Sequence, residues 1–437
     1  MTWRLGDQGH SKGASRSRCD SSADRLSFAS VSELVIHNAR VMTCDPARRG
    51  LGVIDHGALA MSGNTIRWVG HTAERPRGDR ELDAGGRLVT PGLIDCHTHA
   101  IFAGDRSEEF AMRAAGKSYL EIAGAGGGIA ASLGPTRAAT DEELIAALGR
   151  RLDTARAGGT TTIEVKTGYD LTVDGELRLL RCIAVASAAR AQRVVPTLLA
   201  HVVPPELVVI RERFVGELCE QLIPRAAGDR LATSVDVYCD EGAFTLAETR
   251  AIFAAARTAG LAVRAHAGQF RDLGAAELLG EFAGRSADHL EHVSDTGIAA
   301  LASTGTVAVM LPGACVQLRL PVPPIDRLRR AGVAMAVASD LNPGSSYCET
   351  LPIQMWLATT HFGMTVDEAW LGVTRHAARA LGVGGGTITR GSRGDLIIWG
   401  CDDPAYVPYR YGAGTQLIDA TFVAGERLAM ALSPLPS

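Results

Sequence analysis

Apolar, β-rich runs alternate with helical stretches eight times between about residues 91 and 340, and no other feature constrains the fold as strongly. Such alternation is typical of βα units around a parallel sheet. The second run, 160–165, and the eighth, 333–339, consist mostly of small or apolar residues, as expected for strands covered on both faces. Eight units predict an α/β fold, a closed (β/α)₈ TIM barrel. Helices are expected at about Asp141–Ala157, Gly175–Arg190, Leu246–Ala259 and Pro324–Ala331.

Polar or titratable residues follow most of these runs. The runs end near His97, Lys166, His201, Asp240, His266, His289, Pro312 and Asp340. The C-terminal ends of the strands form the face on which (β/α)₈ enzymes assemble their active sites. The sequence therefore predicts a site at that face, built from residues that are far apart in the chain.

The two ends of the chain carry a different pattern, with short β-type runs broken by turns. These runs are 34–36, 57–61 and 65–69 before the helical region, and 395–399 and 420–423 after it. We expect both ends to pair into one small β-sandwich domain, residues 31–90 plus 388–437, beside a barrel of residues 91–387. Two unrelated terminal extensions are the alternative. Residues 1–30 lack apolar periodicity and are expected to form a disordered leader, with a transit peptide as the rival interpretation.

Composition argues against several classes of protein. Nine cysteines are scattered without a C-x-x-C pair, which favours a reducing compartment, and we expect a cytoplasmic location. The sequence has no continuous stretch of about 18 apolar residues and no N-terminal apolar core of a secretory signal. The net charge is −4 and there is no basic run. We therefore expect neither a membrane nor a nucleic-acid partner.

The apolar run that starts at Pro91 ends in two histidines one residue apart, His97 and His99. Residues i and i+2 of an extended strand point to the same side, so both imidazoles can reach one metal ion. His266 lies at the end of the fifth run and Asp340 at the end of the eighth. An ionised carboxylate after apolar residues is costly unless it is paired or bound to a metal. Each feature alone also fits a polar residue at a strand end, but together the four predict one metal site on the barrel axis.

His289 ends the sixth run. It could be a further metal ligand, a general acid or base, or a hydrogen-bonded core residue. We favour the acid–base role, because imidazole titrates near neutral pH and an activated water needs a group that accepts its proton. Asp340 can share this proton transfer. Lys166, at the end of the second run, is interpreted as a structural residue or as the charge partner of Glu164.

Several motifs resemble the imidazolonepropionases, the cyclic-amide hydrolases of histidine degradation within the amidohydrolase superfamily. The resemblance runs from about Leu34 to the C-terminus, and its motifs are DCHTH at 95–99, AGDR at 103–106, AGGGI at 125–129, EVKTGY at 164–169 and DLNPGS at 340–345. It implies hydrolysis of the cyclic amide of 4-imidazolone-5-propanoate, a small-molecule substrate, to N-formimidoyl-L-glutamate by water activated on one divalent metal, zinc or iron. A homodimer is also expected from the resemblance.

The resemblance implies roles for individual residues. The metal ligands would be His97, His99, His266 and Asp340. Arg106 would bind the propionate carboxylate, for which a guanidinium fork is well shaped, and a surface ion pair with Asp105 or Glu108 is the alternative. Further substrate contacts would be Tyr169, His201, Asn342, Gly344 and Ser345. Tyr119 would close over the ring or serve only in packing.

Gln269 departs from the family pattern, because several members carry glutamate at this position. A glutamine cannot act as a base. We therefore expect Gln269 to hydrogen-bond the ring, while His289 or Asp340 accepts the proton. Gly268 also replaces an acidic residue that is often present in the family.

Two rival functions remain open on the sequence alone. An aminohydrolase (deaminase) of a heterocyclic ring would also use metal-activated water, but it would release ammonia and would not need Arg106 for a carboxylate. A non-catalytic scaffold would keep the barrel and lose metal ligands, whereas all four candidate ligands are present in this sequence. A substrate panel and elemental analysis for metal separate these functions.

Overall fold

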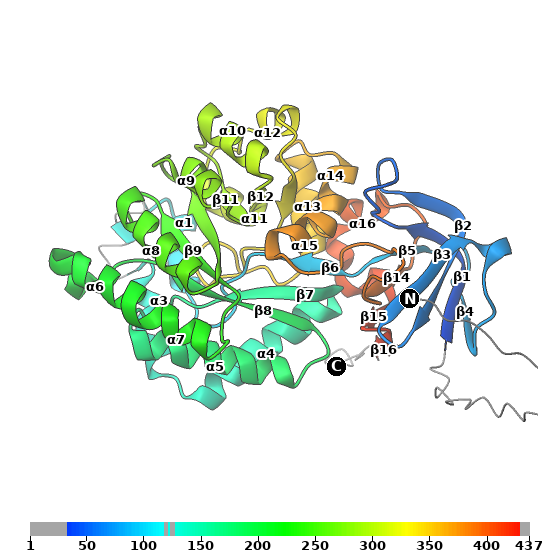
Figure 1. Ribbon diagram of the computed structural model, residues 1–437, viewed down its shortest axis with the longest axis horizontal. Helices are drawn as coiled ribbons and strands as arrows, with labels where there is room; N and C mark the ends of the chain where they lie inside the picture. The colour runs from blue at the N-terminus through cyan, green and yellow to red at the C-terminus, as the bar shows by residue number, and fades with distance from the viewer. Residues whose placement is uncertain (1–32, 118–120, 123–126, 429–437) are drawn as a thin grey trace, which may run out of the picture. The chain divides into compact units, whose positions relative to one another are not determined.

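The computed structural model describes residues 33–117, 121–122 and 127–428. Parallel strands form its central sheet in the order β13-β12-β11-β10-β9-β8-β7-β6, so neighbours in the sheet are also neighbours along the chain. The strands are β6 Leu93–Asp95, β7 Thr160–Lys166, β8 Arg193–Ala200, β9 Ser234–Cys239, β10 Ala262–Ala267, β11 Ser286–His289, β12 Val307–Met310 and β13 Met335–Val337. Helices lie around this sheet (Figure 1).

Backbone hydrogen bonds close the sheet into a barrel. Beyond the ends of β6 and β13, Thr98 and Leu341 form a parallel bridge. The amide of Asp340 donates to the carbonyl of His97 at 3.0 Å. The amide of His99 donates to the carbonyl of Leu341 at 2.8 Å. The predicted (β/α)₈ barrel is confirmed, and it closes next to three of the candidate metal ligands.

The helices begin where local sequence signals place them. The α-helices are α1 Ser107–Ala114, α3 Ala130–Ala138, α4 Asp141–Ala157, α5 Val173–Ala188, α6 Arg211–Glu217, α7 Ile223–Gly228, α8 Leu246–Thr258, α9 Ala275–Glu281, α10 Asp295–Thr304, α11 Pro312–Leu318, α12 Ile325–Arg330, α13 Leu351–Thr360, α14 Val366–Gly372, α15 Arg375–Leu381 and α16 Tyr406–Tyr409. The 3₁₀ helices are η1 Thr72–Glu74, η2 Pro205–Ile210 and η4 Tyr411–Leu417, and η3 Leu218–Leu222 is a π-helix. Helices α4, α8 and α14 begin with a capping box of a threonine and a glutamate.

The positions of the barrel strands agree closely with the sequence prediction. Each predicted strand end lies within three residues of the observed end. The helix predicted at Asp141–Ala157 has the same bounds in the structure, as α4. The predicted eighth run, 333–339, is a strand only at Met335–Val337.

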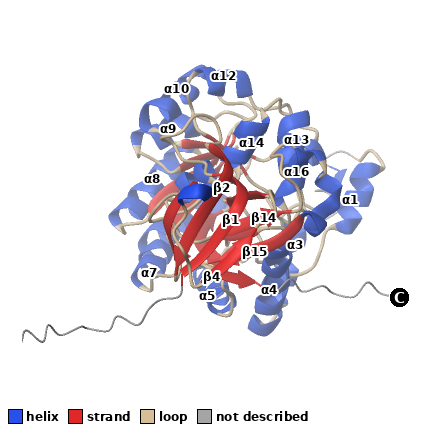
Figure 2. Ribbon diagram, turned by 90° about the vertical axis from the view of Figure 1, so that its right-hand side faces the viewer, coloured by secondary structure: helices blue, strands red, loops and turns tan. Residues whose placement is uncertain are grey.

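A second sheet combines strands from both ends of the described chain. Its order is β16-β15-β14-β5-β1-β2-β3, with β4 beside β1. The strands are β1 Glu33–Met42, β2 Val53–Ser62, β3 Thr65–His71, β4 Arg80–Asp83, β5 Leu88–Pro91, β14 Leu396–Trp399, β15 Ile418–Val423 and β16 Glu426–Leu428. Figure 2 shows β1, β2, β14 and β15 in this sheet. The antiparallel pairing of β5 with β14 joins the two chain ends, so the alternative of two unrelated extensions is wrong.

Each sheet has a hydrophobic core. Ile36, Leu59 and Phe422 belong to the core of the second sheet, whereas Ile163 and Val237 belong to that of the barrel. The described residues between 33 and 428 belong to one compact unit that contains both sheets, so the predicted division at residues 90–91 and 387–388 stays a prediction. The predicted leader, 1–30, lies outside the described residues. Among the helices described, none has the length and apolar character needed to cross a membrane.

Candidate active site

The ends of three barrel strands bring four candidate metal ligands together. His97 and His99 follow β6, His266 lies in β10, and Asp340 follows β13. The backbone bonds that close the barrel hold the first and last of these segments side by side. Asp340 has a left-handed backbone conformation with a φ of 51°, which turns the chain out of the strand direction. Segments far apart in the chain thus meet at one end of the barrel.

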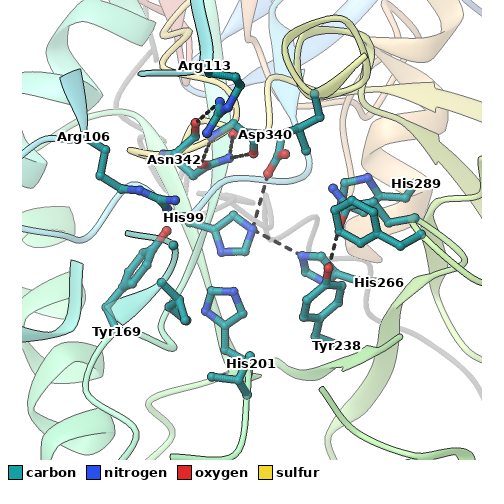
Figure 3. A pocket seen from close by; sticks show the side chains of 18 residues that line it. His99, Arg106, Arg113, Tyr169, His201, Tyr238, His266, His289, Asp340 and Asn342 are labelled. Atoms are coloured by element: carbon teal, nitrogen blue, oxygen red, sulfur yellow. Dashed lines mark hydrogen bonds and ion pairs between the residues drawn. The ribbon is translucent and has the colours of Figure 1, made fainter. Parts of the chain in front are cut away.

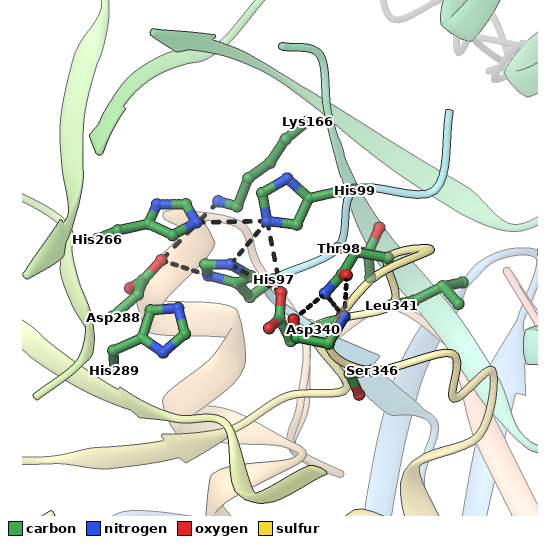
Figure 4. A network of polar contacts seen from close by, with 12 residues as sticks. His97, Thr98, His99, Lys166, His266, Asp288, His289, Asp340, Leu341 and Ser346 are labelled. Atoms are coloured by element: carbon green, nitrogen blue, oxygen red, sulfur yellow. Dashed lines mark hydrogen bonds and ion pairs between the residues drawn. The ribbon is translucent and has the colours of Figure 1, made fainter. Parts of the chain in front are cut away.

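The donor atoms of these four side chains converge (Figure 4). His99 Nε2 lies 3.3 Å from both His97 Nε2 and His266 Nε2. Asp340 Oδ1 lies 3.5 Å from His97 Nε2 and 3.4 Å from His99 Nε2. A tetrahedral site with ligand distances of about 2.1 Å separates its donor atoms by about 3.4 Å. These four separations match the spacing of a tetrahedral site, and the ligand atoms of His97, His99 and His266 lie within 4.8 Å of one another.

Carboxylates behind two of the histidines determine which nitrogen faces the centre. Asp288 Oδ2 lies 2.6 Å from His97 Nδ1, and Asp236 Oδ1 lies 3.1 Å from His266 Nδ1. Each Nδ1 therefore carries the proton that it donates, and each Nε2 presents a lone pair. Neither aspartate is among the site residues predicted from the sequence. The signal that could have found them was an acid within or at the end of an otherwise apolar strand.

Burial keeps the candidate ligand histidines neutral. It lowers the pKa of His97 well below its usual value and that of His99 to about 3. Burial also lowers the pKa of His266 to about 4. It raises the pKa of the Asp340 carboxyl. Ring nitrogens of neutral imidazoles thus face one another and a carboxyl oxygen of Asp340, and a bound cation can accept electron pairs from all of them. The donor set fits one divalent metal.

A buried network of charges lies behind the ligands. Lys166 Nζ lies 2.9 Å from Glu164 Oε1 and 2.6 Å from Asp236 Oδ2. Arg264 forms ion pairs with Glu164 and with Asp288. The interpretation of Lys166 as the charge partner of Glu164 is confirmed. Although burial opposes ionisation of Asp236, Lys166 holds the pKa of this carboxyl well below its usual value, so the Asp236 carboxylate stays charged.

Replacing Asp288 with asparagine should weaken metal retention by about 10- to 100-fold, because carboxylates behind a ligand histidine orient its ring and raise its basicity. The amide keeps the shape of the side chain but removes the charge next to His97. Competition between the purified variant and a chelator measures the effect. Asp295→Asn, at an exposed position in α10, is the matched control. Metal retention equal to that of the wild type would contradict this role of Asp288.

The centre opens into a cavity of about 160 Å³. Of the residues predicted to contact the substrate, its wall contains Arg106, Tyr169, His201, Gln269, Asn342, Gly344 and Ser345. The wall also contains His99, His266, Asp340 and His289, as Figure 3 shows. His97 is fully buried. Tyr119 lies outside the described residues. One cavity therefore joins the candidate ligands to the predicted substrate contacts.

Arg106 lines the cavity as part of an ion pair that the sequence analysis did not predict. Its Nε and Nη2 donate to the two carboxylate oxygens of Glu109, each at 2.7 Å. The ion pair suggested with Asp105 or Glu108 is therefore wrong. The Asp105 carboxylate instead accepts from the amide and the hydroxyl of Ser107. Glu109 holds the guanidinium in place at the cavity wall.

Asn342 shapes the loop after β13. Its Oδ1 accepts from the amides of Gly344 at 2.8 Å and Ser345 at 2.7 Å. Its Nδ2 donates to the carbonyl of Asp340 and to the hydroxyl of Ser345. Both donors and both lone pairs of the amide are thus used within the loop. Asn342 therefore contributes to the cavity by holding Gly344 and Ser345 in their positions.

Tyr169 and His201 are neutral groups of the cavity wall. Burial raises the pKa of Tyr169, so its hydroxyl keeps its proton and can donate a hydrogen bond. Burial, and then the neighbouring His99, lower the pKa of His201 to about 3. His201 Nδ1 donates to the carbonyl of Gly168 at 3.0 Å, which leaves Nε2 as an acceptor. The wall thus presents a donor and an acceptor to a polar ring.

His289 lies beside the cluster of donor atoms. It ends β11 with a φ of 81°, and its ring centroid is 5.4 Å from that of His266. Within the described residues, the histidine group with ligand atoms no more than 4.8 Å apart consists of His97, His99 and His266. Burial lowers the pKa of His289, but Glu291, with Oε1 3.6 Å from Nδ1, outweighs burial and leaves this pKa above its usual value. The position suits proton transfer next to a metal.

Some residues of the cavity wall were not identified from the sequence. Gln269 Oε1 accepts from the hydroxyl of Tyr238 at 2.9 Å, so Tyr238 orients the amide. Arg113 lies in α1, seven residues after Arg106 at the N-cap of that helix, and this helical spacing was an available signal. Gly128 and Ile129 of the AGGGI motif also line the wall, whereas Val202, Phe270 and Leu318 carried no sequence signal.

Comparison with known proteins identifies similar sequences. The family model described as "Amidohydrolase family" matches residues 88–428. The chain is 46% identical over 382 residues to an imidazolonepropionase of Methylobacterium nodulans, with 86% of this chain and 95% of that protein covered. The imidazolonepropionase of Acidiphilium cryptum is 47% identical, with 84% of this chain and 92% of that protein covered. The imidazolonepropionase of Paracoccus denitrificans is 44% identical, with 90% of this chain and 99% of that protein covered.

Solved structures share the fold at low sequence identity. An adenosine deaminase from Xanthomonas campestris with bound zinc has a TM-score of 0.66 at 17% identity, with 92% of this chain and 94% of that chain covered. An atrazine chlorohydrolase from Arthrobacter aurescens, complexed with zinc, has a TM-score of 0.65 at 16% identity, with 92% and 97% covered. These similarities concern the fold alone.

Proposed function

The chain belongs to the imidazolonepropionases of the amidohydrolase family, and on this premise we propose that it hydrolyses the cyclic amide of 4-imidazolone-5-propanoate to N-formimidoyl-L-glutamate in histidine degradation. The observation that carries the proposal is one cavity in which metal donors lie together with the guanidinium groups of Arg106 and Arg113. A hydrolytic centre and a receptor for a carboxylate thus share one wall, as a cyclic amide with an acidic side chain requires.

The centre formed by His97, His99, His266 and Asp340 binds one zinc or iron ion, because imidazole and carboxylate ligands suit both metals. When bound, such a metal makes water a stronger nucleophile near neutral pH and polarises a carbonyl group. Elemental analysis of the purified protein distinguishes the two metals.

His289 serves as the general acid–base. Its Nδ1 is turned toward Glu291, so Nε2 is the atom that accepts a proton from water and returns it to the ring nitrogen. The water oxygen ends on the carbonyl carbon, the carbon–nitrogen bond breaks, and the leaving nitrogen takes the proton. Asp340 is the alternative acceptor of that proton.

Other residues of the wall bind the substrate. Arg106 holds the propionate carboxylate, and Tyr169 and His201 provide a donor and an acceptor for the ring. Gln269 binds the ring through its amide nitrogen, because its amide oxygen already accepts a hydrogen bond from the hydroxyl of Tyr238. These contacts orient the amide toward His289 and the metal ligands.

The compartment and the assembly complete the proposal. The eight cysteines within the described residues are all free thiols, which supports a reducing, cytoplasmic environment. The homodimer that the family resemblance implies stays a prediction.

Purified, metal-loaded protein should remove the absorbance of 4-imidazolone-5-propanoate and form N-formimidoyl-L-glutamate in equal amount, as measured by spectrophotometry and mass spectrometry. Ammonia release from a heterocyclic amine, with no turnover of the imidazolone, would favour the aminohydrolase instead. Metal-loaded protein that leaves the imidazolone unchanged overturns the proposal.

A further inference from the structure

Three charged side chains share one face of the segment that begins helix α1. Arg106 directly precedes the helix. Glu109 and Arg113 lie within it, three and seven residues after Arg106. The side chains of Arg106, Glu109 and Arg113 are 13%, 8% and 19% exposed. Two guanidinium groups and one carboxylate give this cluster a net charge of plus one at the cavity wall. A partly buried net charge of this kind favours an anionic ligand.

Glu109 connects the cluster to its surroundings. Its carboxylate accepts from Nε and Nη2 of Arg106 and lies 3.6 Å from Nη2 of Arg113. It also accepts from the amide of Gly128 at 2.8 Å. In the part of the chain that the structure describes, Nη1 of Arg106 forms no hydrogen bond. Glu109 thus orients the guanidinium and leaves Nη1 available to a ligand.

Both arginines lie against Gly344, in the loop after β13. Arg113 Nη1 donates to the carbonyl of Gly344 at 3.2 Å. A Cβ atom on Gly344 would overlap the guanidinium of Arg106. Both arginines therefore contact the loop that follows Asp340, one of the candidate ligands. Figure 3 shows Arg106 and His289 on opposite sides of His99, so the cationic groups and the proposed acid–base lie at different ends of the site.

We propose that Arg113 is a second receptor for the carboxylate of the substrate, beside Arg106, and that Glu109 is the positioning residue for both. This inference rests on the proposed function, which supplies a substrate with one carboxylate. That carboxylate neutralises the net positive charge of the cluster. Guanidinium groups that are already held in place lose little conformational freedom on binding. Imidazoles and imidazolones without an acidic side chain therefore bind weakly.

Binding of two non-hydrolysable probes tests the role of Arg113. Imidazole-4-propanoate has the carboxylate but no cyclic amide, and imidazole-4-propanamide is its neutral counterpart. In calorimetric titrations of the full, metal-loaded chain, Arg113→Met should weaken binding of the propanoate about tenfold, the scale of one charge-assisted contact. Binding of the propanamide should change by less than about twofold. Arg150→Met, at an exposed position of α4, is the matched control and should change neither.

The variant Glu109→Gln distinguishes a positioning role of Glu109 from the effect of its charge on propanoate binding. The substitution raises the net charge of the cluster from plus one to plus two, so charge alone predicts tighter binding of the propanoate. Loss of positioning predicts binding that is about tenfold weaker. Glu108→Gln removes the same charge from an exposed neighbour and should have no effect. If Glu109→Gln does not fold, Glu109→Asp replaces it, because the shorter carboxylate cannot hold both arginines, and the same weakening is expected.

The roles of Arg113 and Glu109 and the proposed function are contradicted by different results. Unchanged propanoate binding by Arg113→Met overturns the role of Arg113. Equal or tighter propanoate binding by the Glu109 variant overturns the role of Glu109. A wild-type protein that neither hydrolyses the imidazolone nor binds the propanoate counts against the proposed function instead.

Discussion

Asp340→Asn should lower turnover of the imidazolone by about a thousandfold, the equivalent of about 4 kcal/mol of transition-state stabilisation. Asp340 is the one anionic donor among the four candidate ligands, and its Oδ1 lies 3.5 Å and 3.4 Å from two of the histidine donors. Removing this charge leaves three neutral imidazoles to hold a dication. Asparagine is the appropriate replacement because the φ of 51° at this position is tolerated by asparagine better than by alanine.

The variant should also contain less metal after dialysis, as measured by elemental analysis alongside kcat/KM. Asp229→Asn makes the same chemical change at an exposed position after α7 and should leave both quantities unchanged. An Asp340→Asn protein that keeps one metal per chain and turns over within tenfold of the wild type would show that Asp340 is not a ligand.

His289→Asn should reduce kcat by at least about a hundredfold while the metal content stays at the wild-type level. The imidazole lies beside the donor cluster, with its ring centroid 5.4 Å from that of His266, so its loss removes a proton carrier and leaves the ligands in place. The φ of 81° at His289 again makes asparagine a better replacement than alanine.

Single-turnover kinetics and elemental analysis of the same preparation distinguish lost proton transfer from lost metal. His292→Asn, three residues further along and exposed, is the matched control. Near-normal turnover by His289→Asn would remove the acid–base assignment and leave Asp340 as the group that accepts the proton.

The barrel could be predicted because its signals are local. A strand covered on both faces needs consecutive small or apolar residues, and the run at 333–339 shows this directly. The residues that end such runs must lie at the C-terminal face of the barrel, which is why His97, His266 and Asp340 could be placed in one site before their distances were known. The H-x-H spacing added the direction of two side chains.

The contacts of Arg106 could not be predicted in the same way. The sequence placed it at the substrate carboxylate or in an ion pair with Asp105 or Glu108, whereas its partner is Glu109. Several acidic residues lie within reach in the sequence, and only the course of the chain before α1 decides which one the guanidinium meets. The contacts of Asn342 could not be predicted either. The sequence placed Asn342 at the substrate, whereas its amide oxygen accepts hydrogen bonds from Gly344 and Ser345 in its own loop.

By itself, the sequence determined the eight strands of the barrel and the strand ends at which the four candidate ligands lie, because hydrophobic periodicity and strand ends depend on near neighbours. It also placed β-type runs at both chain ends, which pair as β5 and β14 in the structure. Only the tertiary structure decided that Asp236 and Asp288 contact two of the candidate ligand histidines and that Glu109 joins Arg106 to Arg113. The physical reason is that a buried charge must find a partner wherever the fold brings one, and desolvation makes that pairing obligatory without any fixed spacing along the chain.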